Sequence, residues 1–309
     1  MADWLRTLHF LAFTTLSSTP LTFTKNTFVL ERRYAMPLYI TETGSPDKPA
    51  IVFLHGGGGG GWMWQPQMVQ LAASFHCLAP DLPEHGHSMD VKPFTITGSA
   101  DLVADLIRSQ VAGGRAHVVG LSEGAQVTVA LLSRHPEVID HAIVSSAIML
   151  PMPMVSWMFT PQVAGFSYDI SIPPFKNSDW WIRLNMKYAA AIPDSYYPQF
   201  KHAFQSYTRD SFVHLMVENQ SFRQPAGLEK AKVPVLVLAG KKEYRQMIQS
   251  ARNLLAALPN ATGRLVSLGP KSSLGQEHNW SMTAPELFTS TVRAWVTDQP
   301  LPAELSPLN

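Results

Sequence analysis

The 309-residue sequence has a single cysteine, Cys77, which excludes an intrachain disulfide and makes a cysteine-based metal site unexpected. Cys77 lies in the apolar stretch FHCLAP, so we interpret it as a small buried side chain rather than a reactive thiol. The sequence also lacks an excess of charge, because 24 Lys and Arg stand against 23 Asp and Glu for a formal net charge of +1. This balance favours neither a nucleic-acid partner nor a polybasic membrane anchor.

Long hydrophobic runs are absent as well, since no stretch reaches the ~20 apolar residues that a membrane-spanning helix needs. The short apolar run at residues 8–16 follows one basic residue, Arg6, and precedes no A-x-A-like site, so it is a poor secretory signal. We expect residues 1–35 to be a peripheral extension of uncertain order, with the folded domain beginning near Met36. We expect a cytoplasmic protein, with secretion through the N-terminal segment as the alternative.

The sequence does contain a regular alternation of short apolar runs and helical patterns, which implies an α/β fold with a mostly parallel central sheet and helices on both faces. Continuous runs of Val, Ile and Leu fit strands that are buried on both faces. Helical spacing predicts helices over 102–111, 247–255 and 287–296, with Ser99 as N-cap of the first and Pro285 starting the last. The predicted strands are 50–54, 75–80, 117–121, 142–146, 233–239 and 264–268, preceded by an early strand at 38–44 for which an antiparallel direction is considered.

The alternation is interrupted from residue 151 to residue 224, where Met, Trp, Tyr and Phe are frequent and no comparable strand run occurs. We interpret 151–224 as a helical cap inserted into a core made of residues 36–150 and 225–309. An insertion at the carboxyl ends of parallel strands lies over the place where such sheets bind ligands. Most of its aromatic side chains are expected to form the cap's own core, and a few to line a pocket.

Residues 120–124, GLSEG, place Ser122 between two glycines at the corner where a predicted strand becomes a helix. The pattern is G-x-S-x-G, in which a tight strand-to-helix turn exposes the serine hydroxyl above the sheet. Side chains at the two glycine positions would clash, and the helix start places unpaired N–H groups beside the hydroxyl. The motif predicts that Ser122 is a nucleophile; the alternative is a glycine-flanked helix start with Ser122 as N-cap.

The stretch HGGGGGGWMW, residues 55–64, directly follows a predicted strand. Acyl transfer develops an oxyanion that needs preorganised N–H donors, and a glycine-rich turn at a strand end can aim backbone N–H groups inward. We choose the N–H groups of Gly57 and Glu123 as the two donors. The alternatives are a flexible turn and a phosphate-binding loop; the latter is disfavoured because no Gly-Lys-Ser/Thr or G-x-G-x-x-G pattern follows.

His278 has the best position among the eleven histidines for a general base, because it lies between the last predicted strand and the last predicted helix. His55 and His85 are the competitors, although a histidine beside the oxyanion loop often has a structural hydrogen-bonding role. A His–His–Asp metal site in the loop 81–88 is a further alternative, but no other ligands cluster with it. We therefore expect no metal site.

A base needs an orienting acid, and residues 211–297 contain no aspartate. Glu243 follows a predicted strand on a strand-end loop, so it is the best candidate. Glu277 is adjacent to His278 and would usually point away from it, and Glu286 lies in the first turn of the last helix, where it suits the dipole. The alternative for Glu243 is a surface glutamate neutralised by neighbouring basic residues.

Together these motifs resemble the α/β-hydrolase superfamily over essentially residues 36–296. The order Ser122, Glu243, His278 matches the superfamily's order of nucleophile, acid and base. The resemblance implies an α/β-hydrolase fold and hydrolytic chemistry, and the serine argues against haloalkane dehalogenases and epoxide hydrolases, which use an aspartate there. The markers that carry the resemblance are His55-Gly56, Asp81-Leu82-Pro83 with His85-Gly86 and Ser88, the elbow around Ser122, and the late His278.

Three positions depart from the superfamily's pattern. Glu243 stands where Asp is commoner, Glu123 follows the nucleophile where an apolar or neutral residue is commoner, and Glu84 replaces a glycine. The run Trp62-Met63-Trp64 is similar to the methylesterase and hydroxynitrile-lyase branch, but this short match selects no substrate.

The sequence thus predicts a serine hydrolase of the carboxylesterase type, acting through Ser122, His278 and Glu243 on a small to medium, largely apolar ester, without cofactor or metal. Two other classes stay open, namely a C–C bond hydrolase or lyase with the same triad and a ligand-binding homologue without turnover. We expect a small-molecule ester as the partner, neither nucleic acid nor membrane, and a monomer or homodimer. The expected substrate-pocket residues are His55, Trp62, Trp64, Met152, Trp157 and Trp280.

Overall fold

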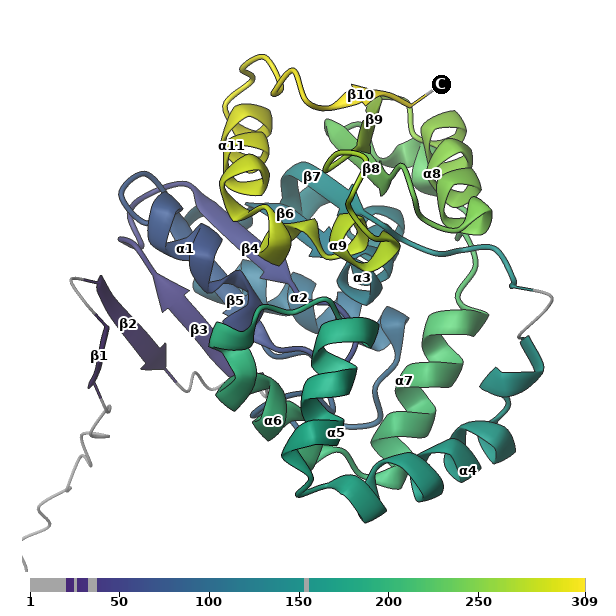
Figure 1. The fold of residues 1–309 in the computed structure, drawn as a ribbon. Helices are drawn as coiled ribbons and strands as arrows, with labels where there is room; N and C mark the ends of the chain where they lie inside the picture. Colours follow the sequence, from purple (N-terminus) through teal and green to yellow (C-terminus); the bar gives the residue numbers. More distant parts are fainter. Residues whose placement is uncertain (1–20, 25–26, 33–37, 153–155, 309) are drawn as a thin grey trace, which may run out of the picture.

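The computed structural model describes residues 21–24, 27–32, 38–152 and 156–308. This part of the chain holds ten strands in one sheet, in the order β1-β2-β3-β5-β4-β6-β7-β8-β9-β10 (Figure 1). The inner strands from β5 to β9 run parallel to one another, and β1, β2, β3 and β10 are antiparallel to their neighbours. The strands are β1 (Leu21–Thr24), β2 (Thr27–Arg32), β3 (Ile40–Thr43), β4 (Ala50–Leu54), β5 (His76–Pro80), β6 (Ala116–Leu121), β7 (Ile139–Ser145), β8 (Val235–Gly240), β9 (Ala261–Val266) and β10 (Ser306–Pro307).

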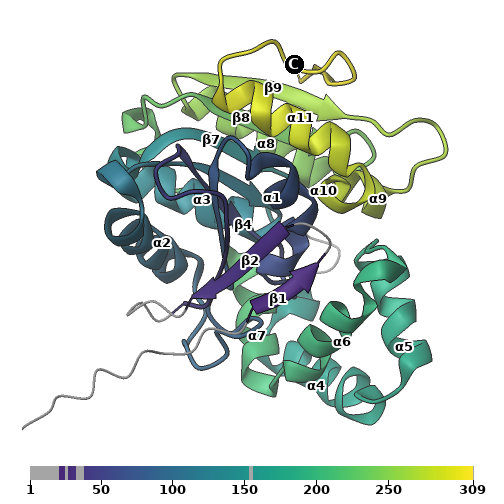
Figure 2. The same ribbon diagram turned by 90° about the vertical axis from the view of Figure 1, so that its left-hand side faces the viewer.

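Helices cover both faces of this sheet and form a further layer at one end of it (Figures 1 and 2). The α-helices are α1 (Gln65–Leu71), α2 (Ile96–Gln110), α3 (Glu123–Arg134), α4 (Pro161–Ser171), α5 (Asp179–Leu184), α6 (Tyr197–Ser206), α7 (Arg209–Ser221), α8 (Arg245–Ala257), α9 (Leu274–His278), α10 (Trp280–Thr283) and α11 (Pro285–Val296). Short 3₁₀ or π turns are η1 (Gly61–Trp64), η2 (Ala112–Gly114), η3 (Pro136–Val138), η4 (Ser156–Phe159), η5 (Pro173–Phe175), η6 (Asn185–Ala189), η7 (Asp194–Tyr196) and η8 (Leu228–Lys230).

The inner strands are apolar along their whole length because both sides of the sheet are covered. Helices α2, α3 and α8 pack on one face, and α1 and α11 pack on the other. Successive side chains of a strand point to opposite faces, so Val118 of β6 joins the first core and Val119 joins the second. This double burial explains why continuous Val, Ile and Leu runs were sufficient to locate the parallel strands.

The fold class predicted from the sequence is confirmed, including an early antiparallel strand, β3, beside β5. Two strands and one helix begin earlier than predicted. The strands predicted at 142–146 and 264–268 begin three residues early, at Ile139 and Ala261, where their pairing with β6 and β8 starts. Helix α2 begins before Ser99, since the extended Thr95 caps it by accepting the N–H of Gly98 at 3.0 Å.

Residues 1–35, predicted to be a peripheral extension, are described only in part. Strands β1 and β2 continue the sheet beyond β3 through antiparallel pairing. Residues 1–20, 25–26 and 33–37, which include the predicted domain start at Met36, lie outside the described residues. The division into extension, core and cap therefore stays a prediction.

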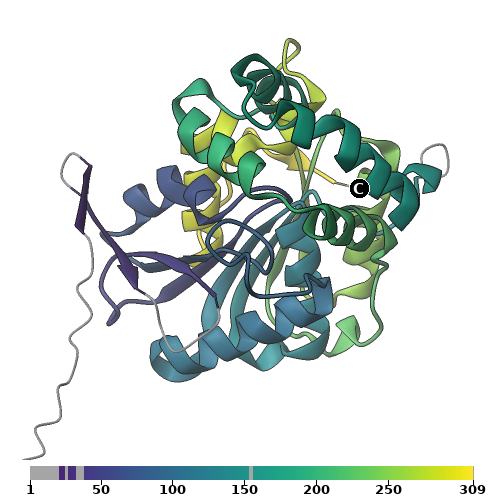
Figure 3. The same cartoon turned by 90° about the horizontal axis from the view of Figure 1, so that it is seen from below.

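The interrupted segment 151–224 contains helices α4 to α7 and, in its described residues, no strand. Figures 1 and 3 show these helices as a layer of their own beside one end of the sheet. This segment, called the cap below, has a small core around Ile172, Ile182 and Phe204. It is joined to the main domain at several points, for example where Gln126 of α3 donates to the carbonyl oxygen of Asn219 at 2.8 Å.

Cys77 is fully buried in β5, and burial raises the pKa of its thiol to about 12. It is therefore a protonated, apolar side chain of the core, as interpreted from the sequence. None of the helices in the described part of the chain is both long enough and apolar enough to cross a lipid bilayer.

Candidate active site

Ser122 occupies the sharp turn between β6 and α3. Its backbone has φ 55° and ψ −113°, and its N–H donates to the carbonyl oxygen of Ser145 at 2.8 Å. A non-glycine residue in such a region costs about 1–3 kcal/mol and persists only where the surrounding structure enforces it. Within the described residues its hydroxyl makes no capping hydrogen bond to α3, so the alternative of a side-chain N-cap is not realised.

The two glycines of the motif are required by close backbone contacts. A Cβ atom added at Gly120 would lie 2.3 Å from both the carbonyl oxygen of Gly124 and Oγ1 of Thr128. A Cβ atom added at Gly124 would lie 2.2 Å from the carbonyl oxygen of Leu54 on the neighbouring strand. Any side chain at either position would therefore displace α3 or β4, which is the steric reason inferred from the sequence.

His278 and Glu243 lie together, although 35 positions separate them in the sequence. Nδ1 of His278, at the end of α9, lies 2.6 Å from Oε1 of Glu243, which follows β8. The other oxygen of Glu243 accepts the N–H of Gly240 at 3.0 Å, and the Glu243 side chain is fully buried. Because a carboxylate only accepts, Nδ1 carries the hydrogen and Nε2 of His278 keeps a lone pair.

Glu277 and Glu286, the other acids considered, lie away from the histidine. The buried Glu277 accepts the N–H of Lys242 at 2.8 Å and the hydroxyl of Ser272 at 2.6 Å, so its carboxylate ties two loops together. Glu286 is exposed in the first turn of α11. Of these candidates, only Glu243 contacts the ring of His278.

The competing histidines are buried and structural. His55 donates through Nδ1 to the carbonyl oxygen of Gly56 at 2.8 Å and accepts the N–H of Leu82 at Nε2 at 3.0 Å. Burial lowers the pKa of His55, and burial lowers the pKa of His85 to about 3. Both rings are therefore neutral at ordinary pH and neither lines the cavity described below.

The polar groups of the loop 81–88 are engaged in hydrogen bonds within the protein. The carboxylate of Asp81 accepts the N–H of Gly61 at 2.6 Å and the N–H of His87 at 2.8 Å, while His85 donates to the carbonyl oxygen of Pro83 at 2.9 Å. In the described ranges no group of three or more His, Cys, Asp or Glu side chains is placed to hold a metal ion.

The glycine loop begins directly against the serine. A Cβ atom added at Gly56 would lie 3.4 Å from Cβ of Ser122. The loop then forms a turn in which the N–H of Gly59 donates to the carbonyl oxygen of Gly56 at 3.1 Å. Gly57 lines the same cavity as Ser122. Glu123 is the first residue of α3, and its N–H has no intrahelical acceptor. Of the two residues predicted as oxyanion donors, Gly57 thus shares a cavity with Ser122, and Glu123 directly follows Ser122 in the chain.

A cavity of about 390 Å³ lies between the cap and the main domain, and both Ser122 and His278 line it. Its remaining walls are mostly apolar, and no Lys, Arg, Asp or Glu side chain lines it. The side chains that the cap contributes include Ile172, Trp181, Ile192, Phe200, Phe204, Tyr207 and Phe212.

The substrate-pocket residues predicted from the sequence do not line this cavity. Trp64 and Trp280 are fully buried because they pack against Phe288 under α11. Trp280 also donates to the hydroxyl of Ser145 at 3.0 Å. His55 is held behind the glycine loop by its own hydrogen bonds.

The other three residues lie farther out. Trp62 stacks on Tyr196 and lines a second cavity, of about 440 Å³, between α1, β3 and α6. Trp157 is 62% exposed on the cap, and Met152 precedes residues outside the described part of the chain. The aromatic residues that line the 390 Å³ cavity come instead from the middle and end of the cap. The sequence shows that the cap is rich in aromatic residues, but which of them face the cavity depends on how α4 to α7 pack against the sheet.

Glu123 has an unusual environment for a carboxyl group. It is completely buried, and among the described residues neither of its oxygens has a hydrogen-bond partner. Burial, and then the carboxylate of Glu218, raise its pKa well above the ordinary value. Both effects favour the uncharged carboxylic acid over the carboxylate.

Comparison with known proteins agrees with the fold. A sequence model described as "Alpha/beta hydrolase family" matches residues 51–291. An "AB hydrolase superfamily protein" of Gibberella zeae is 29% identical over 264 residues, covering 84% of this chain and 83% of that protein. A protein of Caulobacter sp. (strain K31), provisionally named carbamate hydrolase RutD, is 28% identical and covers 82% of this chain and 94% of its own length.

Among solved structures, a thermophilic esterase from Thermogutta terrifontis superposes with a TM-score of 0.66 at 17% identity, covering 91% of this chain and 99% of that one. The enol-lactonase from Burkholderia xenovorans LB400 has a TM-score of 0.62 at 22% identity and covers 90% and 100%. At these identities the superpositions establish the fold. Together with the match over residues 51–291, they show that the chain belongs to the α/β-hydrolase family.

Proposed function

We propose that this protein hydrolyses carboxylic esters through a triad of Ser122, His278 and Glu243. The observation that carries the proposal is the 2.6 Å contact of His278 with the buried Glu243, in a histidine that shares its cavity with the strained Ser122. A buried acid in contact with a histidine, and a serine on the wall of the same cavity, support the acid–base–nucleophile arrangement that acyl transfer needs.

The chemistry follows from the lone pair on Nε2 of His278. The imidazole takes the proton of Ser122 while Oγ attacks the ester carbonyl, and Glu243 stabilises the imidazolium that forms. The N–H groups of Gly57 and Glu123 hold the oxyanion. The imidazolium then protonates the leaving alcohol, and a water molecule deprotonated by His278 releases the acid and restores Ser122.

The cavity favours an uncharged substrate of small to medium size. Its volume of about 390 Å³ lies at the lower end of the range of ligand pockets, and its apolar lining offers no charged side chain to a carboxylate or ammonium group. The titratable side chains on its walls are those of His278 and Tyr207. A short acyl chain on an apolar alcohol therefore fits better than a sugar, phosphate or dicarboxylate.

A fluorophosphonate probe on the full chain tests the nucleophile. It should label the wild type but not Ser122→Ala. Ser146→Ala is the matched control, because Ser146 also ends a strand at positive φ (64°) but is buried and does not line the cavity. Equal labelling of Ser122→Ala and wild type, or no labelling of the wild type, would refute the proposal.

A substrate panel separates ester hydrolysis from the other reactions open to this triad. Short nitrophenyl esters should be the best substrates, ahead of a matched carbamate, which the Caulobacter relative's name suggests including. A vinylogous diketone tests C–C bond hydrolysis and a cyanohydrin tests lyase activity. A kcat/KM for either of these above that for every ester would replace the proposed substrate class while keeping the triad.

A further inference from the structure

The buried carboxyl group of Glu123 has no task in the ester hydrolysis proposed above, which uses only its backbone N–H. Buried polar atoms in folded proteins nearly always have a hydrogen-bond partner, and in the described residues both oxygens of this side chain have none. Such burial costs free energy, so its position in the fold needs a physical reason.

The carboxyl group packs against the outer side of the glycine loop. A Cβ atom added at Gly57 would lie 2.3 Å from Oε2 of Glu123 and 3.5 Å from Cδ1 of Leu215 on α7. Gly57 lines the cavity, whereas Glu123 is fully buried and does not line it. Glu123 therefore contacts the loop that is to hold the oxyanion without contacting the substrate.

The groups around Glu123 offer it no positive charge. Glu218 on α7 is the carboxylate that acts on it, and that carboxylate is fixed by the N–H of Ile96 at 2.9 Å. Tyr207, which follows α6, is the other titratable neighbour, and burial together with Glu123 raises the pKa of its phenol. The loop residues and Leu215 are uncharged. Burial and Glu218 thus act in the same direction, and both favour the protonated acid.

We propose that Glu123 is a positioning residue of the oxyanion loop, a neutral acid packed behind Gly57 whose ionisation stops turnover. The inference rests on the proposed function, because it assigns Gly57 as an oxyanion donor. A negative charge packed on Gly57 would oppose the oxyanion that the same residue has to hold, in a region from which water is excluded. Turnover should therefore fall at alkaline pH.

The pH dependence of kcat for a nitrophenyl ester, from about pH 6 to about pH 10, tests this in the full chain. The wild type should lose activity on the order of 10²-fold at the alkaline end, comparable to the loss of one oxyanion donor. Glu123→Gln has the same shape and cannot ionise, so its pH profile, relative to its own kcat near neutral pH, should lack the alkaline limb.

Two more variants distinguish this role from a structural one. Glu218→Gln removes the neighbouring carboxylate and keeps an acceptor for Ile96, so the alkaline limb should move to lower pH. This variant tests the proposal even if Glu123→Gln does not fold. Glu137→Gln is the matched control on an exposed acid, and its profile should equal that of the wild type.

Fluorophosphonate labelling and circular dichroism at each pH keep the two proposals apart. If Ser122 is not labelled, the proposed function fails. If Ser122 is labelled and the protein stays folded, but Glu123→Gln keeps the wild-type alkaline limb, the role of Glu123 fails alone. The role also fails if folded, labelled Glu123→Gln is inactive at every pH, because the carboxyl would then be needed as a proton donor.

Discussion

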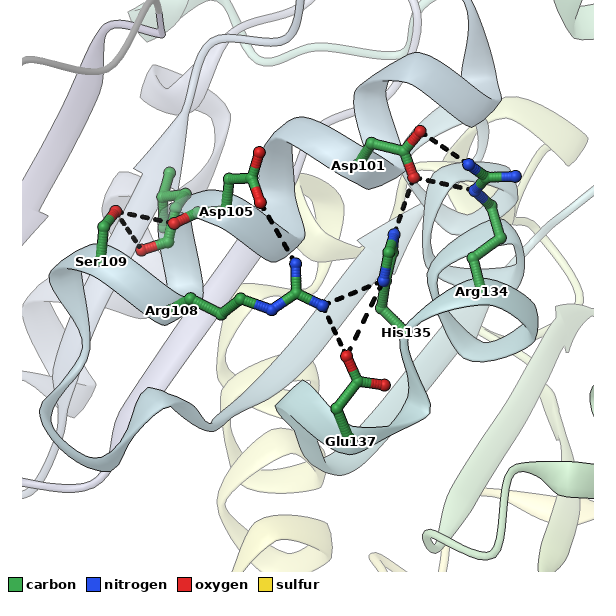
Figure 4. A network of polar contacts seen from close by, with 8 residues as sticks. Asp101, Asp105, Arg108, Ser109, Arg134, His135 and Glu137 are labelled. Atoms are coloured by element: carbon green, nitrogen blue, oxygen red, sulfur yellow. Dashed lines mark hydrogen bonds and ion pairs between the residues drawn. The ribbon is translucent and has the colours of Figure 1, made fainter.

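The two ends of α3 handle charge in opposite ways. At its amino end, Glu123 is buried beside the strained Ser122 and has no partner among the described residues. At its carboxyl end, every acid has a cation: Arg134 binds Asp101 through two hydrogen bonds of 2.8 Å, and His135 donates to the same carboxylate at 2.7 Å (Figure 4).

This carboxyl-end network extends to α2 and η3, where Arg108 contacts Asp105 and Glu137 (Figure 4). Its members are half-exposed, so water solvates them and each pair contributes little to stability. The amino end instead contains the strained backbone of Ser122 and the buried acid Glu123, which has no hydrogen-bond partner among the described residues. Helix α3 is therefore held by partly exposed ion pairs at its carboxyl end. The features that cost folding free energy, a strained backbone and a buried acid, lie at the end that holds the candidate nucleophile.

The largest effect is expected from breaking the contact that orients the candidate base, which shares its cavity with Ser122. Glu243→Ala removes the acceptor of Nδ1 of His278, so the imidazole loses its orientation and the stabilisation of its charged form. We expect kcat for a nitrophenyl ester to fall about 10³–10⁴-fold with little change in KM. Glu286→Ala, which removes an exposed acid on α11, is the control. A Glu243→Ala enzyme within a few-fold of wild type would show that another group orients His278.

The second-largest effect is expected from the close backbone packing at the amino end of α3. Gly120→Ala places a Cβ atom 2.3 Å from the carbonyl oxygen of Gly124, which is backbone and cannot rotate away. We expect a loss of about 1–3 kcal/mol in the free energy of unfolding, measured by urea denaturation, together with loss of fluorophosphonate labelling. Unchanged stability in Gly120→Ala would mean that the turn can widen.

The fold was predictable because its signals are local. Doubly buried strands read as continuous apolar runs, and the steric demands of the elbow are met by two glycines within five residues. The contact of His278 with Glu243 could also be predicted, because the carboxyl ends of parallel strands meet at one edge of the sheet and few acidic residues follow β8. No aspartate was available there to compete with Glu243.

The pocket was not predictable, for a physical reason. Trp64 and Trp280 follow the motifs closely in sequence, yet both turn into the core under α11, where burying an indole ring is most favourable. Cap residues such as Trp181 and Phe204 line the cavity that Ser122 also lines. Which cap residues do so depends on how the cap helices pack, and these helices carry no recognisable sequence motif. Composition identifies such a cap but not its inner face.

Stability as a function of pH gives a smaller effect that probes Glu123 without any substrate. The folded pKa of Glu123 is raised, so its contribution to stability is present below the ordinary pKa of a glutamate and is lost as pH rises toward the folded pKa. Glu123→Gln should therefore be as stable as wild type at about pH 4 and more stable at about pH 8, with Tm higher by about 2–4 °C per kcal/mol. If the difference in Tm between Glu123→Gln and the wild type were the same at both pH values, the carboxyl group of Glu123 would ionise in the folded protein as it does in water.

The smallest effect is expected at the other end of α3. Arg134→Ala removes both hydrogen bonds to Asp101, but the two side chains are 46% and 42% exposed. We expect a loss below about 1 kcal/mol in the free energy of unfolding, reduced further by salt, and no change in kcat. The hydrogen bonds from Arg134 lower the pKa of Asp101, so this small contribution is present above the ordinary pKa of an aspartate and is lost as pH falls through the lowered one. A loss of several kcal/mol would show that the network of Figure 4 acts as a unit. In that case the carboxyl end, and not only the elbow, would hold α3 in the position that the candidate site requires.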